Sequence, residues 1–282
     1  MWTIIYSIRA ARRFRGYRPK PLTLLSARRW INQFDRKDRK LLKKLLDNIV
    51  FMSETKARDI LVEQNAVLMK RLSDAGLPPE KLIYVSVHDV HDAASSSPVL
   101  LNLLRDTARL RNFGCKFIDS RDLLGLNEAM NDLGEGALIY VDDFVGSGIQ
   151  FCEARDYAAD FSAMAAMTTF SEFIIAPCIC EEAYEELEVR GIEAFTGHKH
   201  LKSQRPLHAD STIFTDEEKE SLLLVCDRIS RYGLGFMNMG VMVVPWLNAP
   251  DNVPIVLRGS QGQTPYVGIF PRTTDFPIQS VK

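Results

Sequence analysis

The sequence lacks any apolar run of the roughly 18 residues that a membrane-spanning helix needs. It also lacks a cysteine framework, because its 5 cysteines are odd in number and fit neither a disulfide scaffold nor a CxxC metal knuckle. These absences argue against a helical membrane protein and a disulfide-stabilised domain, and they favour free thiols in a reducing compartment. The first residues are apolar and then basic, the reverse order of a secretory signal. We therefore expect a cytoplasmic protein that does not associate with membranes.

Acidic residues are absent before Asp35, although the net charge of the whole chain is only -1. The same stretch holds a run of basic residues: Arg9, Arg12, Arg13, Arg15, Arg18, Lys20, Arg28 and Arg29. A basic segment of this kind can bind nucleic acid, an acidic partner or anionic lipid. It can equally be a solvated extension with no partner, and the sequence leaves both interpretations open.

The order of expected elements predicts an α/β fold, with a Rossmann-like, mostly parallel sheet flanked by helices. Residues 1–79 are expected to form a helical N-terminal region with the basic arm, residues 80–200 the sheet core, and residues 201–282 a C-terminal cap. Leucines at helical spacing predict a helix over 41–49, and a second apolar stripe that includes Val67 predicts a long helix from 54 to about 75. Thr215, followed by two acids, predicts a helix over 216–230.

Between residues 80 and 200, short apolar or aromatic runs alternate with helical patterns. Strands are expected at 82–87, 115–118, 138–141 and 170–179, and helices at 97–111, 121–132, 149–167 and 181–190. In the last of these strands, Cys178 and Cys180 are expected as one core and one surface thiol. The polar stretch 197–213 is expected to be a mobile loop with solvated histidines, and its Lys199, Lys202 and Arg205 could close over a diphosphate as a lid.

The segment from Leu138 to Gln150, LIYVDDFVGSGIQ, combines a buried strand, two acids, a turn of small residues and a helix. Small residues let backbone N–H groups approach a ligand, and the start of a helix favours a phosphate. Two carboxylates just before the turn can accept hydrogen bonds from vicinal ribose hydroxyls. The expected ligand contacts are therefore Asp142 and Asp143 at the acids, and Val145, Gly146, Ser147, Gly148, Ile149 and Gln150 along the turn.

This segment resembles the signature of type I phosphoribosyltransferases, in which an apolar strand, two acids and two apolar residues precede a Thr/Ser-Gly phosphate loop. Asp142 and Asp143 match the acid pair, and Ser147-Gly148 match the Thr-Gly. The resemblance implies a phosphoribosyl diphosphate or nucleotide ligand, Mg²⁺ at the two aspartates, and catalysis at ribose C1. Gly146 and Gln150 stand where the family has hydroxyl side chains.

More of the chain is similar to a narrower branch, the phosphoribosyltransferase-like proteins of bacterial anti-phage systems. The similar pieces are the segment 30–34 (WINQF), the VDDFVGSG loop, and residues 248–252 (NAPDN) before an apolar run. The resemblance implies an effector of a retron-type defence system, with a reverse transcriptase and its nucleic acid as partners at the basic arm. A non-catalytic nucleotide sensor or assembly module of such a complex is the alternative, favoured by the missing loop hydroxyls.

Tyr140-Val141-Asp142-Asp143 also matches the YxDD box of reverse transcriptases, in which the acids hold two metals in a β-hairpin. That hairpin requires the chain to return as a strand, whereas Gly146 and Gly148 interrupt it within a few residues. We therefore expect a parallel strand at 138–141, and an antiparallel hairpin there would favour the polymerase.

A second cluster follows the strand at 82–87. Ser95, Ser96 and Ser97 are candidates to bind a diphosphate at the start of the next helix, although Ser97 could serve as the helix cap alone. The preceding HDVHD, residues 88–92, could bind a metal only if further ligands joined it.

Overall fold

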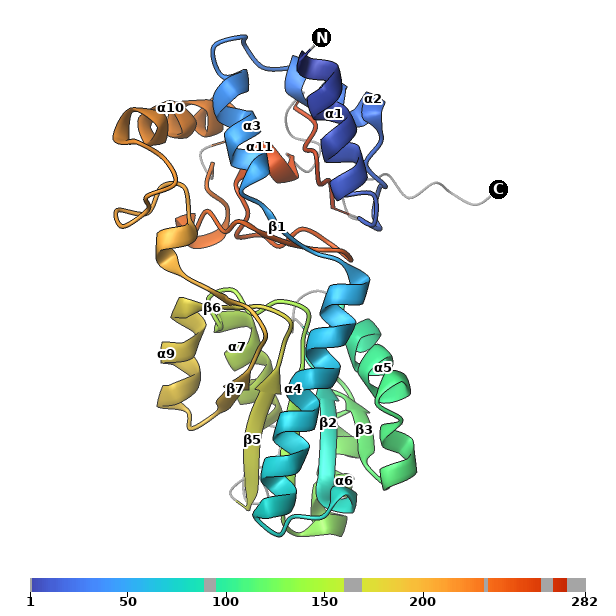
Figure 1. Ribbon diagram of the computed structural model, residues 1–282. Helices are drawn as coiled ribbons and strands as arrows, with labels where there is room; N and C mark the ends of the chain where they lie inside the picture. Colours follow the sequence, from blue (N-terminus) through green and yellow to red (C-terminus); the bar gives the residue numbers. More distant parts are fainter. Residues whose placement is uncertain (1, 89–94, 160–168, 231–232, 260–265, 273–282) are drawn as a thin grey trace. The chain divides into compact units, whose positions relative to one another are not determined.

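The computed structural model describes residues 2–88, 95–159, 169–230, 233–259 and 266–272. The chain divides into two compact units (Figure 1). Residues 55–200 form one, here called the sheet unit, and residues 1–54 together with 201–282 form the other, here called the terminal unit.

The sheet unit is built on a five-stranded sheet with the order β3-β2-β4-β5-β7. Its strands are β2 (Leu82–Ser86), β3 (Lys116–Asp119), β4 (Gly136–Val141), β5 (Phe170–Ile175) and β7 (Glu193–Phe195). Every neighbouring pair is parallel, and β4 lies in the centre with all its residues buried. A short parallel pair, β6 (Ile179–Cys180) and β8 (Lys199–His200), follows β5 and β7.

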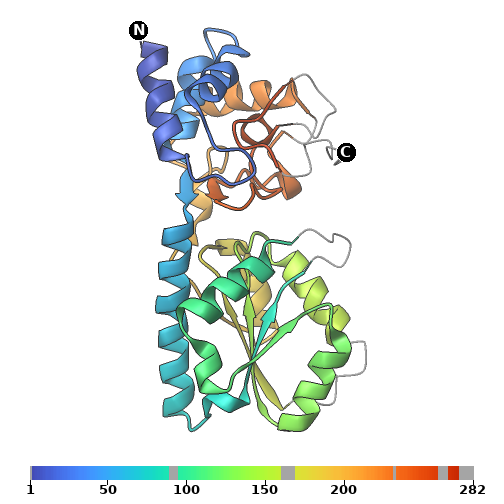
Figure 2. The same cartoon turned by 90° about the vertical axis from the view of Figure 1, so that its right-hand side faces the viewer.

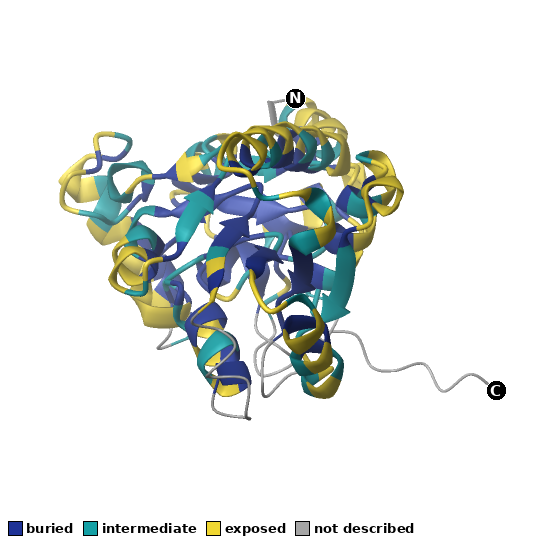
Figure 3. Cartoon of the chain, turned by 90° about the horizontal axis from the view of Figure 1, so that it is seen from below, coloured by how far each residue is buried: buried dark blue, intermediate teal, exposed yellow. Residues whose placement is uncertain are grey.

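Helices cover both faces of this sheet, as Figures 2 and 3 show. They are α4 (Glu54–Asp74), α5 (Ser97–Thr107), α6 (Leu123–Leu133), α7 (Ile149–Ala158) and α9 (Glu181–Val189), with single 3₁₀ turns at η1 (Pro79–Lys81) and η2 (Leu110–Phe113). Helices α6, α7 and α9 share one apolar cluster with Ile83, Leu138 and Ile174 of the strands. Helix α4 packs on the opposite face, where Tyr84 donates a hydrogen bond of 2.7 Å to Asn65.

The strand order changes direction between β2 and β4. After β2 the chain moves outward to β3, and it then returns past β2 to form β4. In open α/β sheets such a reversal leaves a crevice at the carboxyl ends of the two strands, and ligands bind there. The segments that follow β2 and β4 are the two that the sequence selected as candidate sites.

The terminal unit combines the two ends of the chain around one apolar core. Its elements are α1 (Trp2–Arg13), α2 (Leu24–Asn32), α3 (Arg39–Asp47), β1 (Val50–Met52), η4 (Lys202–Gln204), α10 (Asp216–Asp227), η5 (Phe236–Asn238), β9 (Val243–Pro245) and α11 (Ile255–Arg258). Strands β1 and β9 pair in parallel. Phe14, Trp30 and Leu42 from the beginning of the chain share the core with Leu222 and Phe270 from its end.

The main features expected of the sheet region are confirmed. Segment 138–141 lies within a central parallel strand, so the antiparallel hairpin of the polymerase interpretation is absent at Asp142. Helix α10 begins with the expected capping box, in which the Thr215 hydroxyl accepts from the Glu218 N–H at 3.2 Å. In the described part of the chain, no helix has both the length and the apolar character needed to cross a membrane.

Other expectations were wrong. The division into two units differs from the three parts expected, because the terminal segments share one core and α4 packs on the sheet. The basic segment is not a solvated extension, because Phe14 and Tyr17, between α1 and α2, are buried in the core of the terminal unit. Val67 is exposed, since it lies off the buried stripe of α4. The expected strand 170–179 ends at Ile175, and the latter part of helix 149–167 lies outside the described residues.

The stretch 197–213 is not the expected loop, because it contains β8 and η4. His200 is buried and so is not a solvated loop histidine. Of the expected lid residues, Arg205 is buried, and the exposed Lys199 lies with its ammonium group 4.3 Å from the ring centroid of Tyr184. Cys178 and Cys180 are both buried, rather than one in the core and one on the surface. The reason is that the chain leaves β5 before Cys178, so the two thiols do not alternate along one strand.

Candidate functional site

Asp142 and Asp143 directly follow the central strand, at its carboxyl end. The Asp142 N–H donates to the carbonyl of Ile175 at 3.2 Å, which extends the contact between β4 and β5 by one residue. The Asp143 N–H donates to Oδ1 of Asp142 at 2.9 Å, and the Ser96 hydroxyl donates to the carboxylate of Asp143. Both acids are half-buried, and their backbone is held by the sheet.

The electrostatic environment of this pair disfavours two negative charges. Burial raises the pKa of Asp142 well above its usual range, and the adjacent charge of Asp143 raises it further. Burial also raises the pKa of Asp143, while the hydrogen bond from Ser96 acts in the opposite direction. Within the described ranges, no lysine, arginine or histidine forms an ion pair with either acid. Negative charge on this pair is therefore offset by no basic side chain in the described part of the protein, and its oxygens can accept hydrogen bonds from a ligand.

The turn after the acids is fixed at its base. Phe144 and Val145 are buried, and Val145 exchanges backbone hydrogen bonds with the β6 segment, donating to Cys178 at 3.1 Å and accepting from Cys180 at 2.9 Å. This pairing is a long-range contact that the sequence did not reveal. It holds the start of the turn rigidly beside the sheet.

The turn itself presents free donors. Among the described residues, the backbone N–H groups of Gly146, Ser147 and Gly148 donate to no protein acceptor, while the Ile149 N–H reaches the Ser147 hydroxyl at 3.4 Å. Gly148 is the N-cap of α7, so these groups lie at the positive end of a helix. Gly146 and Ser147 are partly exposed, and the Gln150 side chain position is exposed. Such an arrangement can bind a phosphate group.

Gly148 has a role in the fold as well as in ligand access. Its φ of +85° lies in the left-handed region that side chains rarely adopt, and a Cβ atom there would lie 3.4 Å from Ala183 of α9. From the sequence alone, close approach of a ligand is the expected reason for a small residue here. The left-handed φ shows that the backbone conformation at the start of α7 also favours glycine here.

The three serines after β2 have different roles. The buried Ser97 hydroxyl accepts from the Val87 N–H at 2.6 Å and donates to the Val141 carbonyl, so it joins the ends of β2 and β4. Ser97 is therefore neither the helix cap nor a free ligand group, because α5 has Ser96 at its N-cap and the Ser97 hydroxyl is already used. The Ser95 hydroxyl donates to the Val87 carbonyl at 2.8 Å. Ser96, bound to Asp143, remains the serine nearest the acids.

His88 and Asp119 form a contact at the same edge of the sheet that the sequence patterns did not predict. The two side chains approach within 3.1 Å (Nε2 to Oδ2), close enough for an ion pair but not aligned as a hydrogen bond. His88 is buried, which lowers its pKa, while Arg121 holds Asp119 through two hydrogen bonds. Asp119 is the last residue of β3. An acid at the carboxyl end of an expected strand was the feature of the sequence that could have indicated this contact.

Metal donors are few in the described part of the chain, where no three His, Cys, Asp or Glu side chains come together. The expected HDVHD cluster lies, apart from His88, outside the described residues. Any metal at Asp142 and Asp143 would thus complete its coordination with oxygens of a ligand and water, as Mg²⁺ commonly does.

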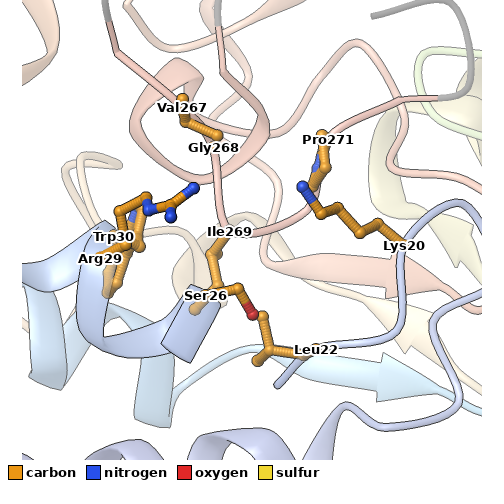
Figure 4. A pocket seen from close by; sticks show the side chains of 9 residues that line it. All are labelled: Lys20, Leu22, Ser26, Arg29, Trp30, Val267, Gly268, Ile269 and Pro271. Atoms are coloured by element: carbon orange, nitrogen blue, oxygen red, sulfur yellow. The ribbon is translucent and has the colours of Figure 1, made fainter. Parts of the chain in front are cut away.

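The terminal unit has a small hollow of its own (Figure 4). Lys20 and Arg29 of the basic segment lie on opposite sides of it, and Leu22, Trp30 and Ile269 also line it. Its volume of about 40 Å³ has room for a few water molecules and not for a nucleotide. The residues that follow β2 and β4 are therefore the stronger candidate site.

Comparison with known proteins agrees with this geometry. The model of the family PRTase-CE, a phosphoribosyltransferase-like domain, matches residues 27–272, so the chain belongs to that family. No curated protein and no solved structure matches it. The match covers parts of both units.

Proposed function

We propose that this member of the phosphoribosyltransferase-like family binds phosphoribosyl diphosphate, or a related nucleotide, and acts at its ribose C1. One observation carries the proposal. Two uncompensated carboxylates and a set of unused backbone donors lie a few residues apart, at the carboxyl end of the central strand. A sugar phosphate offers complementary groups in the same order, with hydroxyls for the acids and a phosphate for the loop.

The residues present suit Mg²⁺ as a cofactor. Asp142 and Asp143 would hold it together with oxygens of the diphosphate, and their uncompensated charge favours a hard cation. When bound, Mg²⁺ would neutralise charge on the diphosphate. The loop from Gly146 to Gly148 would anchor the 5-phosphate through its N–H groups.

The acids would also contribute to the chemical step. The bond between ribose C1 and the diphosphate breaks with positive charge growing on the sugar, and two fixed carboxylates stabilise that charge without moving. A contact of this kind, made mainly in the transition state, is commonly worth about 3 kcal/mol, or roughly a hundredfold in rate.

We further propose that the protein is an effector of a retron-type anti-phage system, in which it meets a reverse transcriptase and its nucleic acid through the basic segment. Arg15, Arg28 and Arg29 support this, because they are exposed and, among the described residues, take part in no ion pair. Exposed arginines of this kind are suited to phosphate backbones.

The second candidate is a sensor or assembly module that binds the nucleotide without turnover. Gly146 and Gln150 favour it, since neither offers the hydroxyl that the resemblance leads one to expect. Retention of both aspartates disfavours it, because a site that only accepts hydroxyl bonds does not need two adjacent carboxyl groups.

Calorimetry with phosphoribosyl diphosphate and Mg²⁺, followed by an assay for diphosphate release, tests the proposal. We expect binding, release, and protection of cells against phage. The double variant Asp142→Asn/Asp143→Asn should bind within roughly tenfold of the wild type, because Asn keeps an acceptor oxygen, yet lose turnover and protection. Binding without release, with full protection retained by the double variant, would identify the module instead.

A further inference from the structure

Helix α1 has two faces of opposite character. Its inner face places Ala10 and Phe14 in the core of the terminal unit, and Arg13 donates to carbonyl groups at the end of α3, including that of Asp47 at 2.9 Å. At 100° per residue, the opposite side carries Ile4, Ile5, Ile8, Arg9 and Arg12, here called the α1 outer face. The isoleucines are 46%, 48% and 36% exposed, far more than folding of this helix requires.

Helix α10, in the same unit, has the complementary outer face. Leu222, Val225 and Cys226 point into the core. The other side carries the α10 outer face: Asp216, Glu217, Glu220, Leu223, Leu224 and Asp227. Leu223 and Leu224 are 41% and 65% exposed. Its acids are almost unpaired, since Asp216 bonds to Lys219 and, in the described part of the chain, the other three contact no cation.

We propose that the α1 outer face of one copy of this chain docks on the α10 outer face of a second copy. Each face has exposed aliphatic side chains, and each carries charge of one sign, basic on α1 and acidic on α10. Arg12 has no acidic partner among the described residues, and Glu217 and Glu220 have no basic one. Burying the two faces together would remove apolar surface from water and pair these charges.

Two other occupants fit the α1 outer face less well. A membrane surface favours a continuous apolar stripe, whereas the rows Ile4-Ile8-Arg12 and Ile5-Arg9 both end in a charge within about two turns. Nucleic acid would use the arginines and leave the isoleucines exposed. Neither occupant explains the acidic face on α10, which a second copy does.

The contact would be head to tail. In Figure 1, α1 and α10 lie on either side of α3 within the terminal unit, so the two faces do not form one self-complementary patch. A heterologous contact of this type builds a ring if it closes and an open chain of copies if it does not. The two faces can therefore be blocked one at a time.

Complementation between two blocked variants tests the proposal. Ile5→Ser/Arg12→Glu disables the α1 outer face, and Leu224→Ser/Glu220→Arg disables the α10 outer face. By light scattering over a concentration series, the wild type should exceed monomer mass, and each variant alone should associate at least about tenfold more weakly. Mixed together, the variants should form a one-to-one dimer through their intact faces.

The controls separate this contact from folding. All four positions are exposed, so the melting temperature of each variant should match that of the wild type. Val67→Ser, at an exposed valine of α4, should leave association unchanged. A wild type that stays monomeric, or folded variants that fail to complement each other, would overturn the proposal. Binding of monomers to phosphatidylglycerol vesicles through Ile5 would do so as well and would assign the face to a membrane.

Discussion

Replacing Asp142 by Asn should stabilise the ligand-free protein while removing its activity. The Asn side chain keeps the oxygen that accepts the Asp143 N–H at 2.9 Å, so no hydrogen bond is lost. It removes a carboxyl group whose ionisation is opposed by burial and by the charge of Asp143. Relief of such local strain at a functional site is commonly worth about 1 kcal/mol, or about 2–4 °C in melting temperature for a domain of 150–250 residues.

The effect should depend on pH in a defined direction. The pKa of Asp142 is raised in the folded protein, so the folded state holds this proton more tightly than the unfolded state does. The stability that protonated Asp142 contributes is fully present below the pKa of an aspartate in the unfolded chain, which is about 3.9. It is lost as the pH rises through the pKa of Asp142 in the folded protein. The variant has no such loss. Its advantage should therefore be absent near the unfolded pKa, grow as pH rises, and level off once Asp142 is ionised in the wild type.

Thermal unfolding followed by circular dichroism, at a series of pH values from acidic to mildly alkaline, measures this difference. Asp106→Asn is the matched control, because Asp106 is exposed and the hydrogen bond from Arg105 lowers its pKa instead of raising it. That variant should gain nothing at neutral pH. A variant Asp142→Asn that is less stable than the wild type at neutral pH, or whose advantage does not change with pH, would refute the reasoning about the acid pair.

Two further predictions concern the phosphate loop and the basic segment. Gly148→Ala should destabilise the ligand-free protein by about 1–2 kcal/mol, because φ is +85° at this position. Calorimetry should also show weaker binding of phosphoribosyl diphosphate. An unchanged melting temperature would reject the structural role of Gly148. Arg28→Gln/Arg29→Gln should lower the slope of log K against log salt for duplex DNA by about 2, measured by fluorescence anisotropy. The same slope in both proteins would exclude these arginines from a nucleic-acid surface.

Features of the fold that depend on local signals could be predicted from the sequence. The apolar run at 138–141 and the Gly-Ser-Gly turn locate β4 and the start of α7, because strand and turn preferences act over a few residues. The capping box of α10 is a signal of the same kind. The candidate acids could be predicted for the same reason, since they are adjacent in sequence to the strand that positions them.

Features that depend on contacts between distant residues could not be predicted. From the sequence, Ser97 is a candidate helix cap. In the folded chain the ends of β2 and β4 lie close together, and the Ser97 hydroxyl forms hydrogen bonds with the backbone of both Val87 and Val141. The pairing of β6 with β8 buries His200 in a stretch whose polar composition is typical of a loop. The basic segment is also polar in composition, yet Phe14 and Tyr17 anchor it to a core that the distant C-terminal residues complete.

The acids and the loop N–H groups of the site, which have no partner in the described protein, favour a ligand that carries both a negative phosphate and a bound metal cation. Folding normally pairs buried or half-buried polar groups, because an unpaired group costs free energy. Here the protein leaves two acids without a cation and the N–H groups of Gly146, Ser147 and Gly148 without acceptors among the described residues. Neither set can satisfy the other, since the sheet fixes the acids and the pairing of Val145 fixes the loop. A ligand with a phosphate at one end and a metal-bound diphosphate near its ribose would satisfy both sets at once, whereas a simple phosphate would satisfy only the loop.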